Sequence, residues 1–148
     1  MRTLFNNECR VGLLVRLGRV RPEHPPQWGQ MSAPQMLAHL SDQMRVTLGD
    51  APCSPIRSAL RYPGIKHAAL YVLPWPKGRV QSPPEGFATR PTSWSRDLAS
   101  LKALVARFIA RGPSGTWPEH PFFGPLSGPA WGVFCYRHFD HHLRQFGA

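Results

Sequence analysis

Three histidines lie within five positions near the C-terminus, in the segment YRHFDHHLRQFG that runs from Tyr136 to Gly147. Two of them, His138 and His142, are four residues apart, so on a helix their imidazoles would share one face, one turn apart. This spacing lets two ring nitrogens reach a single metal ion. Because such pairs also occur by chance, the spacing alone leaves a solvated basic tail or packed histidines as alternatives.

The residues before this pair indicate that it points into the protein core. Trp131 and Cys135 precede His138 at helical spacing and form the stripe that a helix over residues 129–145 would bury. Buried imidazoles need partners, because an unsatisfied buried polar group costs about 1–3 kcal/mol. A metal ion and a carboxylate are the usual partners, which favours a divalent metal site.

A third ligand must come from elsewhere, and the remaining histidines are His24, His39, His67, His120 and His141. His141 is rotated away from His142 on the same predicted helix, so a flanking position suits it better. His39 lies beside the apolar row of another predicted helix. Taken alone, a histidine there is more often a boundary residue than a ligand, but three inward-facing histidines together favour a metal site.

Four amphipathic helices are expected to position these side chains, because apolar residues recur at three- and four-residue spacing. The clearest helix has Ser32 and Gln35 in a capping-box pattern, with Pro34 in the first turn. Four such helices bury their stripes most simply in an all-α four-helix bundle. The predicted helices cover residues 3–20, 33–49, 94–111 and 129–145.

A long segment rich in proline and glycine, residues 50–92, connects the second and third of these helices. A connection of this length in a compact domain is usually functional or disordered. Its apolar residues suggest that it folds over the core, with short helices near residues 54–61 and 66–71. The length of the chain predicts one domain over residues 1–148.

Composition narrows the functional classes. With 42% hydrophobic and 18% charged residues and no apolar run of about 20 residues, neither a disordered chain nor a membrane-spanning one is expected. The N-terminus lacks the pattern of a secretory signal, which predicts a cytoplasmic protein. Cys9, Cys53 and Cys135 are odd in number and widely separated, which argues against a disulfide framework.

A formal net charge of +10 would attract phosphates and other anions, so a basic module that binds nucleic acid or another polyanion is an alternative function. The arginines are scattered from Arg2 to Arg144 without a continuous basic run. We therefore do not expect nucleic acid to be the main partner.

Four segments together resemble the DinB/YfiT-like superfamily, and in particular an uncharacterised bacterial branch of it. They are WGQMSAPQMLAHLSD (28–42), LPWPKG (73–78), HPFFGPLSGPAWG (120–132) and YRHFDHHLRQFG (136–147). Members of that superfamily are four-helix bundles, often dimeric, that bind a divalent metal ion through one histidine on the second helix and two on the last. The resemblance therefore implies His39, His138 and His142 as ligands, and a homodimer.

The resemblance also implies an activity class, because members with assigned activities include hydrolases and thiol-dependent transferases that act on small molecules. Three neutral imidazoles leave a metal ion with an open position for water or substrate, and zinc or nickel suits such ligands. The expected function is thus a metal-dependent hydrolase or a transferase that uses a low-molecular-weight thiol. A bundle whose metal has no catalytic role is the other alternative.

Several further side chains are candidates for supporting roles. His120, Lys77 and Gln145 are expected at the rim of a pocket, where a purely structural role is as plausible for each. Asp42, one turn after His39, would orient a ligand or form a surface pair. We expect Asp140 to lie in solvent or at a subunit contact. Trp75 and Trp117 are expected either to line the pocket or simply to pack against neighbouring residues.

Overall fold

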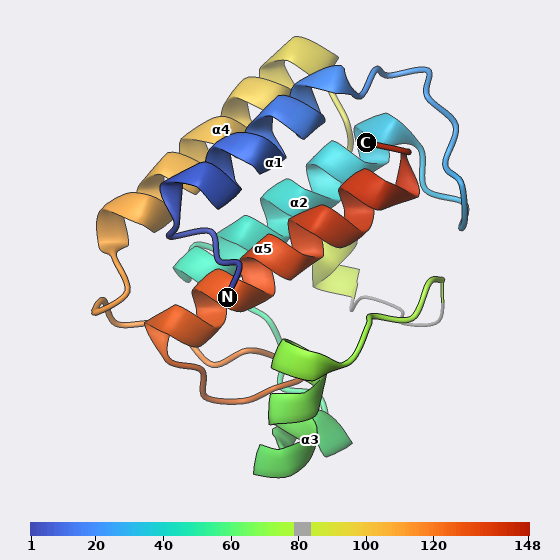
Figure 1. Ribbon diagram of the computed structural model, residues 1–148. Helices are drawn as coiled ribbons and strands as arrows, with labels where there is room; N and C mark the ends of the chain where they lie inside the picture. The colour runs from blue at the N-terminus through green and yellow to red at the C-terminus, as the bar shows by residue number, and fades with distance from the viewer. Residues whose placement is uncertain (79–83) are drawn as a thin grey trace.

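The computed structural model describes residues 1–78 and 84–148, and within these ranges it contains helices and no strand (Figure 1). The all-α prediction is therefore confirmed. The described chain has one α-helix more than the four predicted for the bundle, because Pro63 begins a short additional helix inside the connection. The five α-helices are α1 (Asn7–Arg19), α2 (Ala33–Leu48), α3 (Pro63–His67), α4 (Trp94–Arg111) and α5 (Gly128–Gln145).

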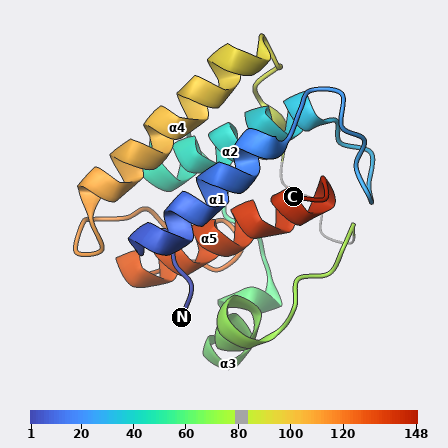
Figure 2. The same ribbon diagram turned by 45° about the horizontal axis from the view of Figure 1, so that its top comes forward.

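The four longer helices lie side by side, with α2 packed against both α4 and α5, and α1 packed against α5 (Figures 1 and 2). Their facing apolar stripes make the core, whose largest fully buried side chains include Leu17, Met36, Leu37, Met44, Phe108, Trp131 and Phe139. Across the described residues, none of the helices has both the length and the hydropathy required to cross a membrane.

The two helices that carry the histidines have strong local start signals. Ser32 caps α2, accepting a hydrogen bond from the backbone N–H of Gln35, while the Gln35 side chain accepts one from the Ser32 N–H. Gly49 ends this helix in the left-handed conformation, with φ of 74°, which glycine adopts without strain. Ser127 caps α5 by accepting from the N–H of Ala130. These predicted boundaries are correct to within one residue.

Helix α1 differs from the prediction in its start and in its buried face. It begins at Asn7, because the Asn6 side chain caps it by accepting from the N–H of Cys9. The apolar spacing of residues 3–20 predicts a buried stripe that includes Val11, Val15 and Leu17, but Val11 and Val15 are about half exposed, at 49% and 51%. Leu17 is buried as predicted, and Leu13, which was not in the predicted stripe, is buried with it. Residues two apart point in nearly opposite directions on a helix. Helix α1 therefore cannot bury the row of Val11 and Val15 together with the row of Leu13 and Leu17.

The connection between α2 and α4 is folded, in short helical pieces near those predicted. A 3₁₀ turn, η1 (Ala59–Arg61), precedes α3; a π-helical turn, η2 (Ala68–Val72), follows it; and a second 3₁₀ turn, η3 (Pro84–Phe87), packs against α2. The guanidinium of Arg137 on α5 donates to the carbonyls of Ala69 and Leu70, which ties η2 to the bundle. Residues 79–83 of the predicted connection lie outside the described part of the chain.

Candidate metal centre

Helices α2 and α5 bring three histidines together inside the protein. The Nε2 atom of His138 lies 3.1 Å from the Nε2 atoms of both His39 and His142. All three rings are buried, with exposed fractions of 1% for His39 and 8% for each of the others. Their ligand atoms lie within 4.8 Å of one another, a spacing suitable for a single metal ion.

Hydrogen bonds at the outer side of two rings fix their tautomers. His39 Nδ1 lies 2.6 Å from the backbone oxygen of Gly86, and His142 Nδ1 lies 2.9 Å from the side-chain oxygen of Gln145. The Gln145 amide nitrogen donates to the carbonyl of Trp28, so its oxygen must face His142. Both oxygens only accept, which places a proton on each Nδ1 and leaves each Nε2 with a free lone pair.

These tautomers make the centre suitable for a cation. The lone pairs of His39 and His142 both face the Nε2 of His138, which can carry only one proton. At most one of the two lone pairs can therefore accept a hydrogen bond. A single metal ion between the three nitrogens would satisfy all of them, and a neighbouring carbonyl or amide on the outer nitrogen is the usual support for a histidine ligand.

The histidines are also in the protonation state that metal binding requires. Burial lowers the pKa of His39 and of His138 below the ordinary value, and it lowers the pKa of His142 to about 3. For His138 and His142, part of this lowering comes from the neighbouring imidazoles, because a second positive charge would be close by. All three rings are therefore neutral near pH 7 and can donate a lone pair to a metal ion.

Asp42 supports His39 indirectly rather than by touching it. Its carboxylate is buried and accepts from both the N–H and the hydroxyl of Thr89, and it pairs with Arg45 at 2.8 Å. Thr89 ends a segment, residues 84–89, that includes the Gly86 carbonyl and Phe87. The Phe87 ring stacks on the His39 ring with centroids 4.7 Å apart. Asp42 therefore holds the segment that orients His39 without contacting the ring itself, and it also forms the ion pair with the partly exposed Arg45.

The histidine cluster lies in the wall of a cavity of about 1090 Å³. Most of the wall is apolar and includes the rings of Trp28, Trp75, Phe87 and Phe134. A cavity of this size and character accommodates a small organic molecule. The cluster can thus face a substrate as well as a metal ion.

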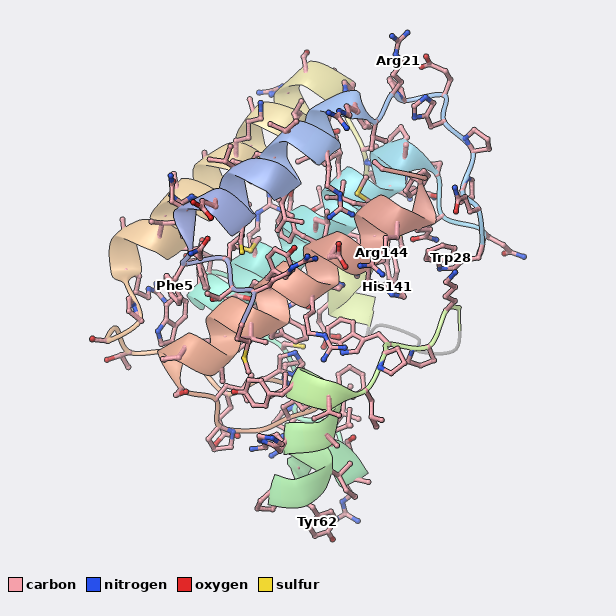
Figure 3. The ribbon with its side chains drawn as sticks, in the orientation of Figure 1. Phe5, Arg21, Trp28, Tyr62, His141 and Arg144 are labelled. Carbon is pink, nitrogen blue, oxygen red and sulfur yellow. The ribbon has the colours of Figure 1, made fainter. Side chains whose placement is uncertain are left out.

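His141, for which a flanking position was expected, and Lys77, which was expected at the rim, both lie against Trp28 at one edge of the cavity. His141 is half-buried on α5 and meets the edge of Trp28, with ring centroids 5.8 Å apart (Figure 3). The Lys77 amine lies 4.5 Å from the centre of the same Trp28 ring. Lys77 does not line the cavity itself, whereas His141 and Trp28 do.

The remaining predicted residues lie in different places. His120 lines the cavity outside the histidine cluster, and Trp117 packs against Phe5 and Phe108 without lining it. Asp140 was expected in solvent or at a subunit contact; it is half-buried and pairs with Arg16 of α1 and Arg144 of α5. It therefore links two helices of the same chain.

Two supporting residues differ from what the sequence suggested. Gln145 was expected at the rim of a pocket; it does line the cavity, but it is buried and accepts from His142. Its position one turn after that histidine was the available signal. The role of Gly86 was missed, because it acts through a backbone carbonyl and no residue type marks such an atom.

Among protein families, the family described as a protein of unknown function (DUF1569) matches residues 15–148. This range contains the three clustered histidines together with Gly86 and Gln145. Searches of curated proteins and of solved structures found no match.

Proposed function

The chain belongs to the DUF1569 family, and on this premise we propose that it is a metal-dependent enzyme whose ligands are His39, His138 and His142. The proposed reaction is hydrolysis of a small molecule, or its transfer to or from a low-molecular-weight thiol. Zinc and nickel are the proposed metals, because both suit imidazole ligands. The activity class comes from the DinB/YfiT-like resemblance, and the metal centre is supported independently by geometry.

The arrangement of the four longer helices supports the proposed DinB/YfiT-like relationship. We assign α1, α2, α4 and α5 to the four-helix bundle of that superfamily and treat α3 as part of the connection. One clustered histidine is on the second of these helices and two are on the last, which is the order that the superfamily would require. A homodimer is part of the same proposal.

The observation that carries the proposal is the convergence of two fixed lone pairs on the Nε2 of His138. Within the described residues, three histidines are the side chains of this cluster that could bind a metal ion. Three protein ligands are typical of catalytic rather than structural zinc sites. When bound, the ion would lower the pKa of a water molecule or bind a thiolate. Gly86 and Gln145 orient the ligands, and the aromatic rings of the cavity wall would contact a bound substrate.

Metal content of the untagged, full-length protein tests this proposal. We expect about one zinc or nickel ion per chain after growth with both metals, measured by mass spectrometry. His39→Ala and His142→Ala should each lose most of it. His67→Ala is the matched control, because His67 is an exposed histidine outside the cluster and its loss should leave the metal content unchanged.

Unchanged metal content in His39→Ala, or none in the wild type, would refute the metal centre. If metal is present, panels of small esters, amides and thiol acceptors assayed with and without a chelator then test catalysis. Activity that the chelator abolishes, and that His67→Ala retains, supports the enzymatic assignment. Absence of activity in every panel would favour a bundle whose metal has no catalytic role.

A further inference from the structure

His120 has a fixed tautomer. It lies between α4 and α5, its side chain is 2% exposed, and its Nδ1 accepts from the backbone N–H groups of Phe122 and Phe123 at 3.1 and 3.3 Å. An Nδ1 that accepts carries no proton, so the proton of the neutral ring is on Nε2. Burial, and then the positive charges of Arg61 and Lys66, lower the pKa of His120 to about 3, so the ring is neutral at pH 7.

The Nε2–H of His120 is a donor without a hydrogen-bond partner among the residues that the structure describes. Leaving a buried donor unpaired costs about 1–3 kcal/mol, so an acceptor from another molecule would recover that free energy. The ring borders the same cavity as the histidine cluster. Phe134 separates the two sites: its ring centroid is 4.3 Å from that of His120 and 5.6 Å from that of His138.

The surroundings indicate which acceptor would fit. Arg61 and Lys66 are the charged groups that act on His120, and both are cationic. The acid that pairs with Arg61 is Glu119, which is mostly exposed and 3.7 Å away, so it neutralises this charge only weakly. A positive field beside a neutral donor favours an anionic oxygen over a neutral one. The adjoining walls, which include Trp75 and Phe134, favour an apolar or aromatic body.

We propose that the cavity binds a small aromatic or apolar carboxylate whose carboxylate oxygen accepts the Nε2–H of His120, with its other end at the histidine cluster. His120 is then a positioning residue that sets which substrates bind and in which direction. The inference deepens the proposed function and rests on it for the reactive end of the substrate. Binding of the carboxylate at His120 does not require the metal.

Neighbouring side chains must move for a ligand to reach this nitrogen, because Nε2 is buried in the structure. The four aromatic rings around His120 are those of Phe122, Phe123, Trp131 and Phe134. Phe122 is half-buried and the other three are buried. We expect the Phe122 side chain to rotate when the carboxylate enters.

Two substitutions separate the donor role of His120 from its structural role. In His120→Asn, the amide oxygen takes the position of Nδ1 and still accepts from the backbone of Phe122 and Phe123, while the distal donor is lost. In His120→Gln, the amide N–H reaches the position of Nε2 and the near acceptor is lost. Circular dichroism and thermal unfolding establish that each variant is folded before binding is measured.

The binding probe is 3-phenylpropionate, titrated into metal-loaded and chelated full-length protein by isothermal calorimetry or NMR. We expect His120→Asn to weaken binding about tenfold or more, which corresponds to one lost hydrogen bond to a charged acceptor. His120→Gln should bind more tightly than His120→Asn. The neutral analogue 3-phenylpropionamide should bind more weakly than the acid to the wild type.

Equal affinity in wild type and His120→Asn, or no binding of the acid at all, would overturn the proposal. Binding that disappears on chelation but not in His120→Asn would also overturn it, since the carboxylate would then be a metal ligand. Equal or tighter binding of the amide would overturn the assignment of an anionic ligand. If the protein as purified proves to hold no metal and still binds the probe through His120, the metal centre is refuted and this inference stands.

Discussion

The Nδ1 of His142 donates to the side-chain oxygen of Gln145 at 2.9 Å, and the amide of Gln145 in turn donates to the backbone carbonyl of Trp28 at 2.8 Å. Gln145 thereby sets the tautomer of a proposed metal ligand and joins the end of α5 to the segment before α2. A residue with both functions is expected to affect metal affinity as well as packing.

Replacing Gln145 with leucine should therefore weaken metal binding about 10- to 100-fold, because His142 would lose the partner that keeps its Nε2 free. Gln145→Glu keeps an oxygen acceptor for His142 and should retain most of the affinity. Competition with a chromophoric chelator measures both variants. Equal metal affinity in Gln145→Leu and wild type would show that this hydrogen bond does not support the site.

Replacing Asp42 with asparagine should loosen the segment of residues 84–89 and speed the loss of metal. The carboxylate accepts one hydrogen bond from Thr89 on each of its two oxygens, whereas an asparagine amide has a single acceptor oxygen. The expected loss of stability is about 1–3 kcal/mol, since the site is buried. Urea unfolding and the rate of metal transfer to a chelator measure the two effects.

The matched control is Asp97→Asn. Asp97 makes the same pair of contacts, to the N–H and hydroxyl of Thr92, but Thr92 lies outside the segment of residues 84–89 that contacts His39. Its substitution should leave the rate of metal transfer unchanged. If both variants release metal at the wild-type rate, Asp42 has no part in positioning His39.

Acid should destabilise the metal-free protein through His120. Above about pH 6.5 the imidazole is neutral in both folded and unfolded chains, so it adds no pH dependence. Below that value the unfolded chain takes up a proton, while the folded chain, with a pKa of about 3, does not. The free energy of unfolding then falls with decreasing pH, by about 1 kcal/mol per unit for this one group.

Urea unfolding of chelated protein at pH 7.5 and pH 5.5 measures this effect against His120→Asn, which has no titrating group there. The wild type should lose about 1 kcal/mol more than the variant between the two pH values. An equal loss in both proteins would mean that His120 is protonated in the folded state.

Metal binding should stabilise the fold, because the three clustered histidines join α2 to α5 and the site does not exist in the unfolded chain. At a free zinc concentration 100 times the dissociation constant, the gain is about 2.7 kcal/mol. Thermal unfolding with zinc and with chelator should therefore differ for the wild type and for His67→Ala, and coincide for His39→Ala. A zinc-dependent shift that persists in His39→Ala would indicate binding elsewhere.

Much of the secondary structure could be predicted, because its signals are local. The capping box at Ser32 and the left-handed Gly49 mark the ends of α2 within the sequence itself, and the apolar spacing of α4 marks its length. The buried face of α1 could not be chosen in the same way. Both of its rows contain aliphatic residues, and only packing against α5 decides that Leu13 and Leu17 are covered.

The sequence by itself determined that His138 and His142 share a helix face and that His39 lies beside an apolar row, since helical periodicity needs no tertiary information. Only the tertiary structure decided that rings 99 positions apart meet at 3.1 Å. It also decided that Gly86 rather than Asp42 orients His39, and that His120 lines the same cavity while its Nε2–H has no partner among the described residues. The reason is physical: caps and periodicity act over a few residues, whereas the partner of a buried ring is chosen by packing between distant segments, often through backbone atoms that every residue carries.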